Sequence, residues 1–160
     1  MRIDTFRPEH AAAFDALNRA WLVGYGLIEP HDVEQLTDPR KEILDPGGQI
    51  FVALDGGDVV GVCAAIPHGS DAIELAKLAV TPAAQGRGVG RRLVEACVAF
   101  ARDRGARRVE LVSSSRLQAA LKLYESMGFE RGPLPADVQY ETADVYMALD
   151  IGIPTPTITD

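Results

Sequence analysis

The chain has 160 residues, of which 47% are hydrophobic and 24% are charged, and its net charge is −7 at pH 7. This composition is typical of one soluble globular domain that buries a core without disulfides or metal ions, and the negative charge argues against nucleic-acid binding. The first ten residues, MRIDTFRPEH, lack the apolar run of a signal peptide, and no stretch is long and apolar enough to span a membrane. We therefore expect a cytoplasmic protein with no membrane partner.

The first half of the chain predicts a strand, two helices and a hairpin. RIDTF is typical of a short strand, and Pro8 begins a helix whose apolar residues recur on one face. A second short helix is expected at 33–36. The segment PGGQIFVALDGGDVVGVCAAI contains two apolar runs joined by Asp-Gly-Gly-Asp at 55–58, which is the pattern of a β-hairpin. The second run is apolar on both faces, which predicts a central strand.

The second half predicts strands that alternate with helices. IELAKLAV and RRVELVSS are typical of strands, and each precedes an amphipathic helix, ended by Gly105 and by Gly128. YETADVYMALD predicts a last strand, and the residues after Asp150 predict a loosely held tail. The alternation indicates an α/β fold with a central mixed sheet flanked by helices. We expect a single domain over residues 1–150 and a tail over 151–160.

The two cysteines, Cys63 and Cys97, lie in apolar segments of the chain. Both are expected to be buried free thiols, which fits a reducing compartment. Neither has a His or Cys at ligand spacing, so we expect no metal site.

Three glycines lie in VTPAAQGRGVGRRL, at positions 86, 88 and 90, where a helix is about to begin. Glycine weakens a helix by about 1 kcal/mol relative to alanine, so the cluster requires a cause. A turn between a strand and a helix offers unpaired N–H groups and the positive end of a helix dipole, which together bind anions. The turn lacks the Lys-Ser/Thr of a P-loop, and Arg91 stands where a dinucleotide-binding fingerprint needs its third glycine.

The spacing that does fit is Q-x-x-G-x-G from Gln85 to Gly90, and here the chain resembles the GNAT superfamily of N-acetyltransferases. ELAKLAVTPAAQGRGVGRRL resembles the acetyl-CoA strand and pyrophosphate loop of that family, and AALKLYESMGF resembles its C-terminal tyrosine helix. GGQIFVALDGGDVVGVCAA fits the preceding hairpin, so the likeness covers residues 49–130, whereas the first 45 residues match only in their helical layout. The resemblance implies the GNAT fold, in which the strands at 72–80 and 107–113 are parallel neighbours that splay apart at their C-terminal ends.

The resemblance also implies acetyl-CoA as co-substrate. The residues implied to bind it are Leu78, Ala79, Val80, Gln85, Gly86, Arg87, Gly88, Val89, Gly90, Arg91 and Ser114. Backbone N–H groups of the turn would hold the pyrophosphate, with charge from its two arginines, and the strand backbone would pair with the pantetheine arm. An N–H near Leu78 would polarise the thioester carbonyl. The family often has Asn at the position of Leu117, where Ser114 or Ser115 is an alternative contact.

Tyr124 matches the tyrosine that the resemblance implies as the general acid for the CoA thiolate. The apolar helical stripe alone would make it a core residue, but the surrounding LYESMGF favours the catalytic role. Glu74 is the candidate base, because in an unbulged strand it shares a face with Leu78 and Val80 and would point into the acetyl pocket. An exposed Glu74, with water or another residue as the base, is the alternative. The other candidate bases are His10, His31 and His68. His31 and His68 each follow a proline in a predicted loop, which favours a position at the surface.

Acceptor-binding residues are expected in WLVGYGLIEPHD, the segment least like the family. The segment offers Trp21, Tyr25, Glu29 and Asp32, and a carboxylate there would pair with a cationic amine. Tyr25 and Glu29 are the chosen candidates, whereas Trp21 fits the core equally well. Residues 1–71 hold 12 acidic and 5 basic residues, a net charge of −7 that would attract such an amine. The expected function is N-acetyl transfer to a primary amine of a small molecule or amino acid. The alternatives are a protein N-terminus or lysine as acceptor and a non-catalytic acyl-CoA sensor. A homodimer is a further expectation.

Overall fold

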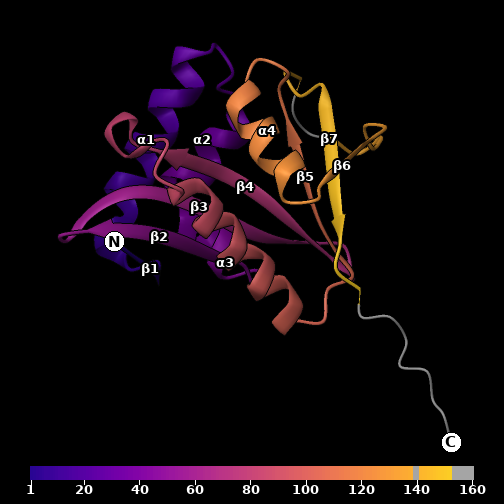
Figure 1. The fold of residues 1–160 in the computed structure, drawn as a ribbon, viewed down its shortest axis with the longest axis horizontal. Helices are drawn as coiled ribbons and strands as arrows, with labels where there is room; N and C mark the ends of the chain where they lie inside the picture. Colours follow the sequence, from indigo (N-terminus) through magenta and orange to yellow (C-terminus); the bar gives the residue numbers. More distant parts are fainter. Residues whose placement is uncertain (139–140, 153–160) are drawn as a thin grey trace, which may run out of the picture.

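A computed structural model describes residues 1–138 and 141–152. The backbone forms one seven-stranded sheet in the order β1-β2-β3-β4-β5-β7-β6, with helices on both faces (Figure 1). The strands are β1 (Arg2–Thr5), β2 (Gln49–Asp55), β3 (Asp58–His68), β4 (Ala72–Val80), β5 (Arg108–Ser113), β6 (Glu130–Gly132) and β7 (Val145–Asp150). The helices are α1 (Ala11–Gly24), α2 (Pro30–Thr37), α3 (Val89–Asp103) and α4 (Gln118–Ser126), with short helical turns η1 (Pro8–His10), η2 (Arg40–Leu44) and η3 (Pro82–Ala84). The predicted α/β fold with a central mixed sheet is confirmed.

Local turn chemistry builds the antiparallel part of the sheet, from β1 to β4. Asp55 pairs with Asp58 at the end of the predicted hairpin, and its turn residues Gly56 and Gly57 have φ angles of +59° and +92°. Glycine adopts these angles without a Cβ clash, so the two strands join through a tight turn. β3 contributes buried residues to both faces of the sheet, as predicted for a central strand.

Two hydrophobic cores attach the helices to the two faces of the sheet. α3 and α4 lie in front of the sheet in Figure 1, and α1 and α2 lie behind it. α3 contributes residues spaced three or four apart, the period of one helix face: Leu93, Val94, Cys97, Val98 and Ala101. Phe14 of α1 and Leu36 of α2 belong to the other core. Cys63 and Cys97 are buried free thiols, as predicted.

β4 departs from a regular strand at Lys77. Its register with β3 gains one residue between Ala76 and Ala79, which defines a β-bulge. Lys77 adopts a φ of +58°, a left-handed conformation that costs a non-glycine residue about 1–2 kcal/mol. Because the bulge shifts the alternation, Leu78 packs against the α3 core and Ala79 against the α1 core.

β4 and β5 are parallel neighbours that pair only near their N-terminal ends. The pairs are Ala72 with Arg108, Ile73 with Val109 and Glu74 with Glu110. Beyond Glu74 the two strands separate, and β5 pairs with β7 along its whole length instead. This confirms the predicted splay, which opens the sheet at the C-terminal ends of β4 and β5.

Several elements near the chain's end differ from the sequence-based expectation. The sequence did not predict the edge strand β6. The last strand begins at Val145 rather than at the predicted residue 140, which lies outside the described residues. The predicted tail begins at 151, yet Ile151 is buried in the α3 core and its N–H donates to the Arg107 carbonyl at 2.8 Å. Residues 153–160 lie outside the described residues. Within 1–138 and 141–152, none of the helices is long and apolar enough to cross a membrane.

Candidate active site

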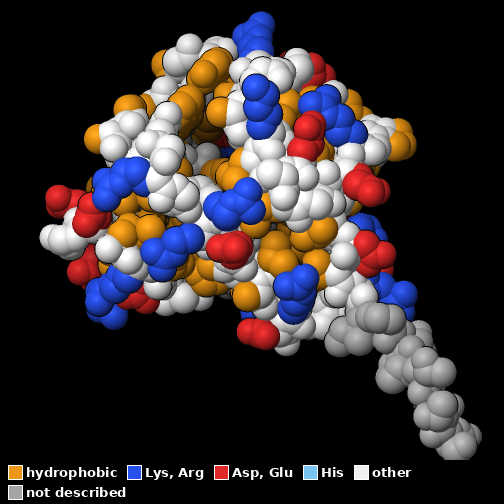
Figure 2. All heavy atoms as spheres, viewed as in Figure 1, with side chains coloured by type: hydrophobic (Ala, Val, Ile, Leu, Met, Phe, Trp, Pro, Cys, Tyr) orange, Lys and Arg blue, Asp and Glu red, His pale blue; other side chains and the backbone are white. Residues whose placement is uncertain are grey.

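A cavity of about 650 Å³ lies where β4 and β5 separate. Its walls come from α1, α2, β4, the turn before α3, the end of β5, α4 and residues 142–143. Figure 2 shows a hollow on this face, between α4 and the helices α1 and α2, with hydrophobic side chains at its rim. Thirteen of the fifteen predicted site residues line the cavity, and the two that do not are Arg87 and Glu29.

The turn before α3 forms one end of the cavity. Gly86 and Gly88 both have φ angles of +78°, which L side chains rarely adopt, and Gly88 is the N-cap of α3 without a side-chain cap. Gly90 is present for a different reason, since a Cβ there would lie 3.2 Å from Leu123 Cδ2. Two glycines therefore shape the turn, and the third allows close packing of α3 on α4. The first N–H groups of a helix have no intrahelical partner and favour an anion.

The two arginines of the turn differ in position. Arg91 lines the cavity, and its Nη2 donates to Ser126 Oγ at 2.6 Å. The guanidinium of Arg87 turns toward the β2–β3 hairpin instead, with Nη2 3.9 Å from Asp55 Oδ2. The position of Arg87 thus gives no support to its predicted contribution of charge at the pyrophosphate.

The C-terminal end of β4 contacts both α1 and the turn. The Val80 carbonyl accepts hydrogen bonds from Trp21 Nε1 and Gln85 Nε2, each at 3.2 Å. The Trp21 indole stacks on the Tyr25 ring, with centroids 5.8 Å apart and planes 8° apart. Trp21, for which the core and the site were equally expected, is partly buried and lines the cavity, as does Tyr25.

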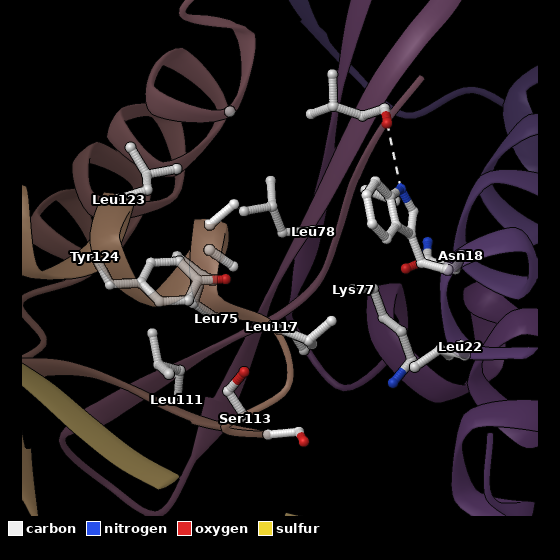
Figure 3. A pocket seen from close by; sticks show the side chains of 18 of the residues that line it. Asn18, Leu22, Leu75, Lys77, Leu78, Leu111, Ser113, Leu117, Leu123 and Tyr124 are labelled. Atoms are coloured by element: carbon white, nitrogen blue, oxygen red, sulfur yellow. Dashed lines mark hydrogen bonds between the residues drawn. The ribbon is translucent and has the colours of Figure 1, made fainter. Parts of the chain in front are cut away.

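Tyr124 is a buried residue of α4, and its hydroxyl is directed into the cavity near Leu75 and Leu78 (Figure 3). Burial raises the pKa of Tyr124 above its ordinary value, and the neighbouring thiols of Cys63 and Cys97 raise it further. The phenol therefore keeps its proton at neutral pH. A protonated phenol in an apolar cavity is able to donate that proton to an anion that forms beside it.

Glu74 also lines the cavity, at the point where β4 and β5 separate. The expectation that it shares a face with Leu78 and Val80 was wrong, because it rested on an unbulged strand. The bulge at Lys77 reverses the alternation, so Leu78 and Val80 belong to the α3 side while Glu74 faces the α1 side. Glu74 and Tyr124 therefore reach the cavity from opposite faces of the sheet.

Opposing charges surround the Glu74 carboxylate. Burial raises the pKa of Glu74, and the carboxylates of Glu110 and Asp137 also raise it. Lys77 and His68 act in the opposite direction, but the pKa stays above its ordinary value. A carboxylate with a raised pKa is a stronger base, which suits proton abstraction from an amine.

Lys77 connects the bulge of β4 to α2 through a buried ion pair. Its Nζ lies 2.6 Å from Asp32 Oδ1, and the two side chains are only 5% and 4% exposed. Asp32 Oδ2 accepts the Glu29 N–H at 3.0 Å, where α2 begins. Sequence reasoning missed this pair, although it left one signal. Glu74 and Lys77, the charged residues of β4, are three positions apart, so a regular strand would point them to opposite faces. Only a bulge between them brings both to the same face.

Glu29 fixes a loop rather than facing the cavity. Its carboxylate accepts the N–H groups of Glu141 at 2.7 Å and Thr142 at 2.9 Å, and also the Thr142 hydroxyl. The predicted pairing of Glu29 with a cationic acceptor is therefore not supported by its position. A second contact crosses the same region, where Arg116 Nη1 donates to the Tyr25 carbonyl at 2.9 Å.

The two serines proposed to replace the missing asparagine differ in position at the start of α4. Ser114 is buried and lines the cavity, and its Oγ accepts the Arg116 N–H at 3.2 Å. Ser115 instead donates from its N–H and its hydroxyl to Asp144, both at 2.7 Å. Leu117 lines the cavity as the N-cap of α4 and gives no side-chain cap.

Sequence reasoning missed the part of α1 that forms the wall opposite Tyr124. Figure 3 shows Asn18 and Leu22 there, beside Lys77. Positions 18, 21, 22 and 25 recur three or four residues apart, so they lie on one helix face, and this spacing was the available signal. In the part of the chain that the structure describes, no group of three or more His, Cys, Asp or Glu residues could hold a metal ion.

The chain is similar to known proteins of one family. The model of the acetyltransferase (GNAT) family matches residues 11–129. N-acetyltransferase family 8 member 2 of Rattus norvegicus is 37% identical over 101 residues, which make up 60% of this chain and 45% of the relative. The chain thus spans less than half the length of that curated relative.

Solved structures share the fold over nearly the whole chain. A GNAT-family acetyltransferase from Staphylococcus aureus superposes with a TM-score of 0.85 at 15% identity, covering 93% of this chain and 98% of that one. A protein from Salmonella typhimurium, solved with its cofactor acetyl-CoA, has a TM-score of 0.72 at 23% identity and covers 97% and 96%. At these identities the similarity shows the fold alone.

Proposed function

Because this chain belongs to the acetyltransferase (GNAT) family, we propose that it transfers the acetyl group of acetyl-CoA to a primary amine of a small molecule or amino acid. The observation that carries the proposal is the large cavity at the separation of β4 from β5. It joins an anion-binding turn at Gly86–Gly90, the hydroxyl of Tyr124 and the carboxylate of Glu74.

The cavity fits acetyl-CoA in shape and in charge. The N–H groups at the start of α3, together with Arg91, suit the pyrophosphate, and the apolar walls around Leu78 and Leu123 suit the pantetheine arm. The Salmonella protein that shares this fold holds acetyl-CoA, which supports the assignment. The N–H near Leu78 in the bulge is the candidate to polarise the thioester carbonyl.

The proposed chemistry needs one base and one acid. Glu74 attracts the acceptor ammonium and takes one of its protons, so that the free amine attacks the thioester carbonyl. The carbon–sulfur bond then breaks, and Tyr124 donates its proton to the CoA thiolate and regains one from the nitrogen. Each turnover converts an ammonium and acetyl-CoA into an amide, CoA and one released proton. General acid–base catalysis of this kind contributes about 10²–10⁴-fold to a rate.

The acceptor side of the cavity favours a small molecule over a protein. The bonds from Glu29 to Thr142 and from Arg116 to Tyr25 tie loops together across this side. An extended peptide needs a continuous groove, which these cross-links interrupt, whereas a small amine does not need one. Asp32 is already paired with Lys77, so Glu74 is the cavity carboxylate best placed to attract a cation.

A panel of primary amines, amino acids and peptides, assayed for CoA release from acetyl-CoA, tests the proposal. We expect turnover of small amines well above that of peptides. Faster turnover of peptides would favour the protein-acetylating alternative. Binding of acetyl-CoA in calorimetry without CoA release from any acceptor would favour the sensor alternative. The cytoplasmic location and the homodimer stay predictions, for cell fractionation and sedimentation velocity to test.

A further inference from the structure

A second, smaller cavity of about 160 Å³ adjoins the first and shares Glu74 with it. Its walls come from α2, β3, β4, β5, β7 and the segment between β6 and β7. The side chains that titrate there are His31, His68, Glu74, Glu110, Asp137 and Tyr146. Glu74 is therefore a wall between the proposed acetyl site and a cluster of charges that the proposed chemistry does not use.

His68 lies at the centre of this cluster with carboxylates at both ring nitrogens. Nδ1 forms a hydrogen bond with Glu110 Oε1, and Nε2 lies 3.2 Å from Asp137 Oδ2. An ionised carboxylate only accepts hydrogen bonds, so both contacts are satisfied only when the ring carries a proton on each nitrogen. The hydrogen bond to Glu110, although burial opposes it, raises the pKa of His68, which agrees with an imidazolium.

Glu110 is held as a carboxylate by donors on its other oxygen. The Tyr146 hydroxyl donates to Oε2 at 2.7 Å, and Arg108 Nε donates to the same oxygen at 3.1 Å. Although burial opposes them, these bonds and the one from His68 lower the pKa of Glu110. Arg108 Nη1 also lies 3.6 Å from Asp71 Oδ1, so the guanidinium charge of Arg108 is shared between Glu110 and Asp71.

The sheet register places this imidazolium beside Glu74. Glu74 pairs with Ile66 on β3 and with Glu110 on β5, while His68, two residues after Ile66, pairs with Ala72. His68 therefore lies on the same face as Glu74 and diagonal to it, a position within reach of long side chains. The small side chain of Ala72 leaves the space in which His68 reaches across β4 to Glu110.

We propose that His68 is a positioning residue for acetyl transfer: its imidazolium, fixed between Glu110 and Asp137, keeps Glu74 ionised and ready to take the acceptor's proton. This inference rests on the proposed function of Glu74 as the base. Without His68, the carboxylates of Glu74, Glu110 and Asp137 would repel one another in a partly buried space. Lys77 lowers the pKa of Glu74 more than His68 does, but its ammonium is also bound to Asp32, so His68 is the cation that faces Glu74 from the smaller cavity.

The test compares His68→Gln with the wild type in two measurements. One is the pH dependence of kcat/KM with an amine that the wild type acetylates. The other is the carbon-13 NMR titration of the Glu74 carboxyl, which needs no turnover and is assigned with Glu74→Gln. Because the cation is lost, Glu74 binds its proton more tightly. The carboxyl midpoint and the acidic limb of kcat/KM both move to higher pH, and activity falls several-fold on the acidic side but not at the plateau.

Two further variants make the test specific. His31→Gln is the matched control, because His31 lines the same cavity from α2 but acts on Glu29, and it leaves the Glu74 midpoint nearly unchanged. His68→Lys keeps a positive charge beside Glu110 and Asp137 and restores much of the shift. Thermal unfolding followed by circular dichroism confirms that each variant folds.

The outcomes separate this inference from the proposed function. An unchanged Glu74 midpoint in His68→Gln overturns the inference even if amines are acetylated. A shifted midpoint with an unshifted acidic limb also overturns it, because Glu74 would not then control the rate. Absence of turnover with every acceptor defeats the proposed function instead, and the NMR titration still decides whether His68 sets the ionisation of Glu74.

Discussion

The two sides of the large cavity are built in different ways. On the side of α3 and α4, its surface consists of backbone N–H groups at the helix start and apolar side chains around Tyr124. On the side of α1 and α2, charged side chains from separate segments hold it together, among them the buried pair of Lys77 and Asp32. The first side depends on shape and the second on charge. Substitutions on the first side should therefore lower catalysis or cofactor binding, and substitutions on the second should lower stability.

Tyr124→Phe should produce the largest effect, and on the α3–α4 side. The change removes one hydroxyl and leaves the ring packed against Phe129, whose centroid lies 5.8 Å away. We expect kcat to fall by about 10²–10⁴-fold, the usual contribution of a general acid. Acetyl-CoA affinity in calorimetry and the unfolding temperature should change little. Turnover at the wild-type rate would show that another group protonates the thiolate.

Asp32→Asn should produce the next largest effect, on the α1–α2 side, and it should act on stability. It removes the negative charge from the buried pair with Lys77, and breaking such a pair costs about 3–5 kcal/mol. The matched control is Asp15→Asn, which breaks the exposed pair with Arg19 and should cost at most about 1 kcal/mol. Urea unfolding measures both free energies. Equal losses would mean that the buried pair does not hold the bulge of β4 to α2.

Gly88→Val should give a smaller effect, on the affinity for acetyl-CoA. Comparison with Gly56→Val separates this effect from that of backbone strain. Gly88 and Gly56 have positive φ angles, and a Cβ at either meets no atom within 4 Å, so valine should destabilise the fold similarly at both. Only Gly88 adjoins the proposed pyrophosphate site, so only Gly88→Val should weaken acetyl-CoA binding in calorimetry. Equal affinities of the two variants would argue that the turn does not bind the cofactor.

The features that sequence alone predicted correctly are those set by neighbouring residues. The hairpin turn at 55–58 depends on two adjacent glycines, and the face of α3 follows from a period of three to four residues. The glycine-rich turn likewise combines positive φ angles with the start of a helix. Each is decided within one short segment, which is why composition and spacing were sufficient.

The features that sequence reasoning missed depend on residues that meet only in the fold. Glu29 binds Thr142, which is more than a hundred positions away in the chain, and His68 reaches Glu110 across an intervening strand. The face of Glu74 was predicted wrongly because one extra residue at Lys77 reverses the alternation. A single bulge, itself stabilised by a distant carboxylate, thus changed the geometry expected for the candidate base.

A crystal structure with acetyl-CoA would test the central claim most directly, namely that the cavity between β4 and β5 is the site of acetyl transfer. We predict the pyrophosphate on the N–H groups of Gln85–Gly90 and the sulfur within hydrogen-bond distance of the Tyr124 hydroxyl. The acetyl carbonyl should face the bulge at Leu78, with Glu74 across the site. Acetyl-CoA bound outside this cavity, or with its sulfur far from Tyr124, would contradict the account.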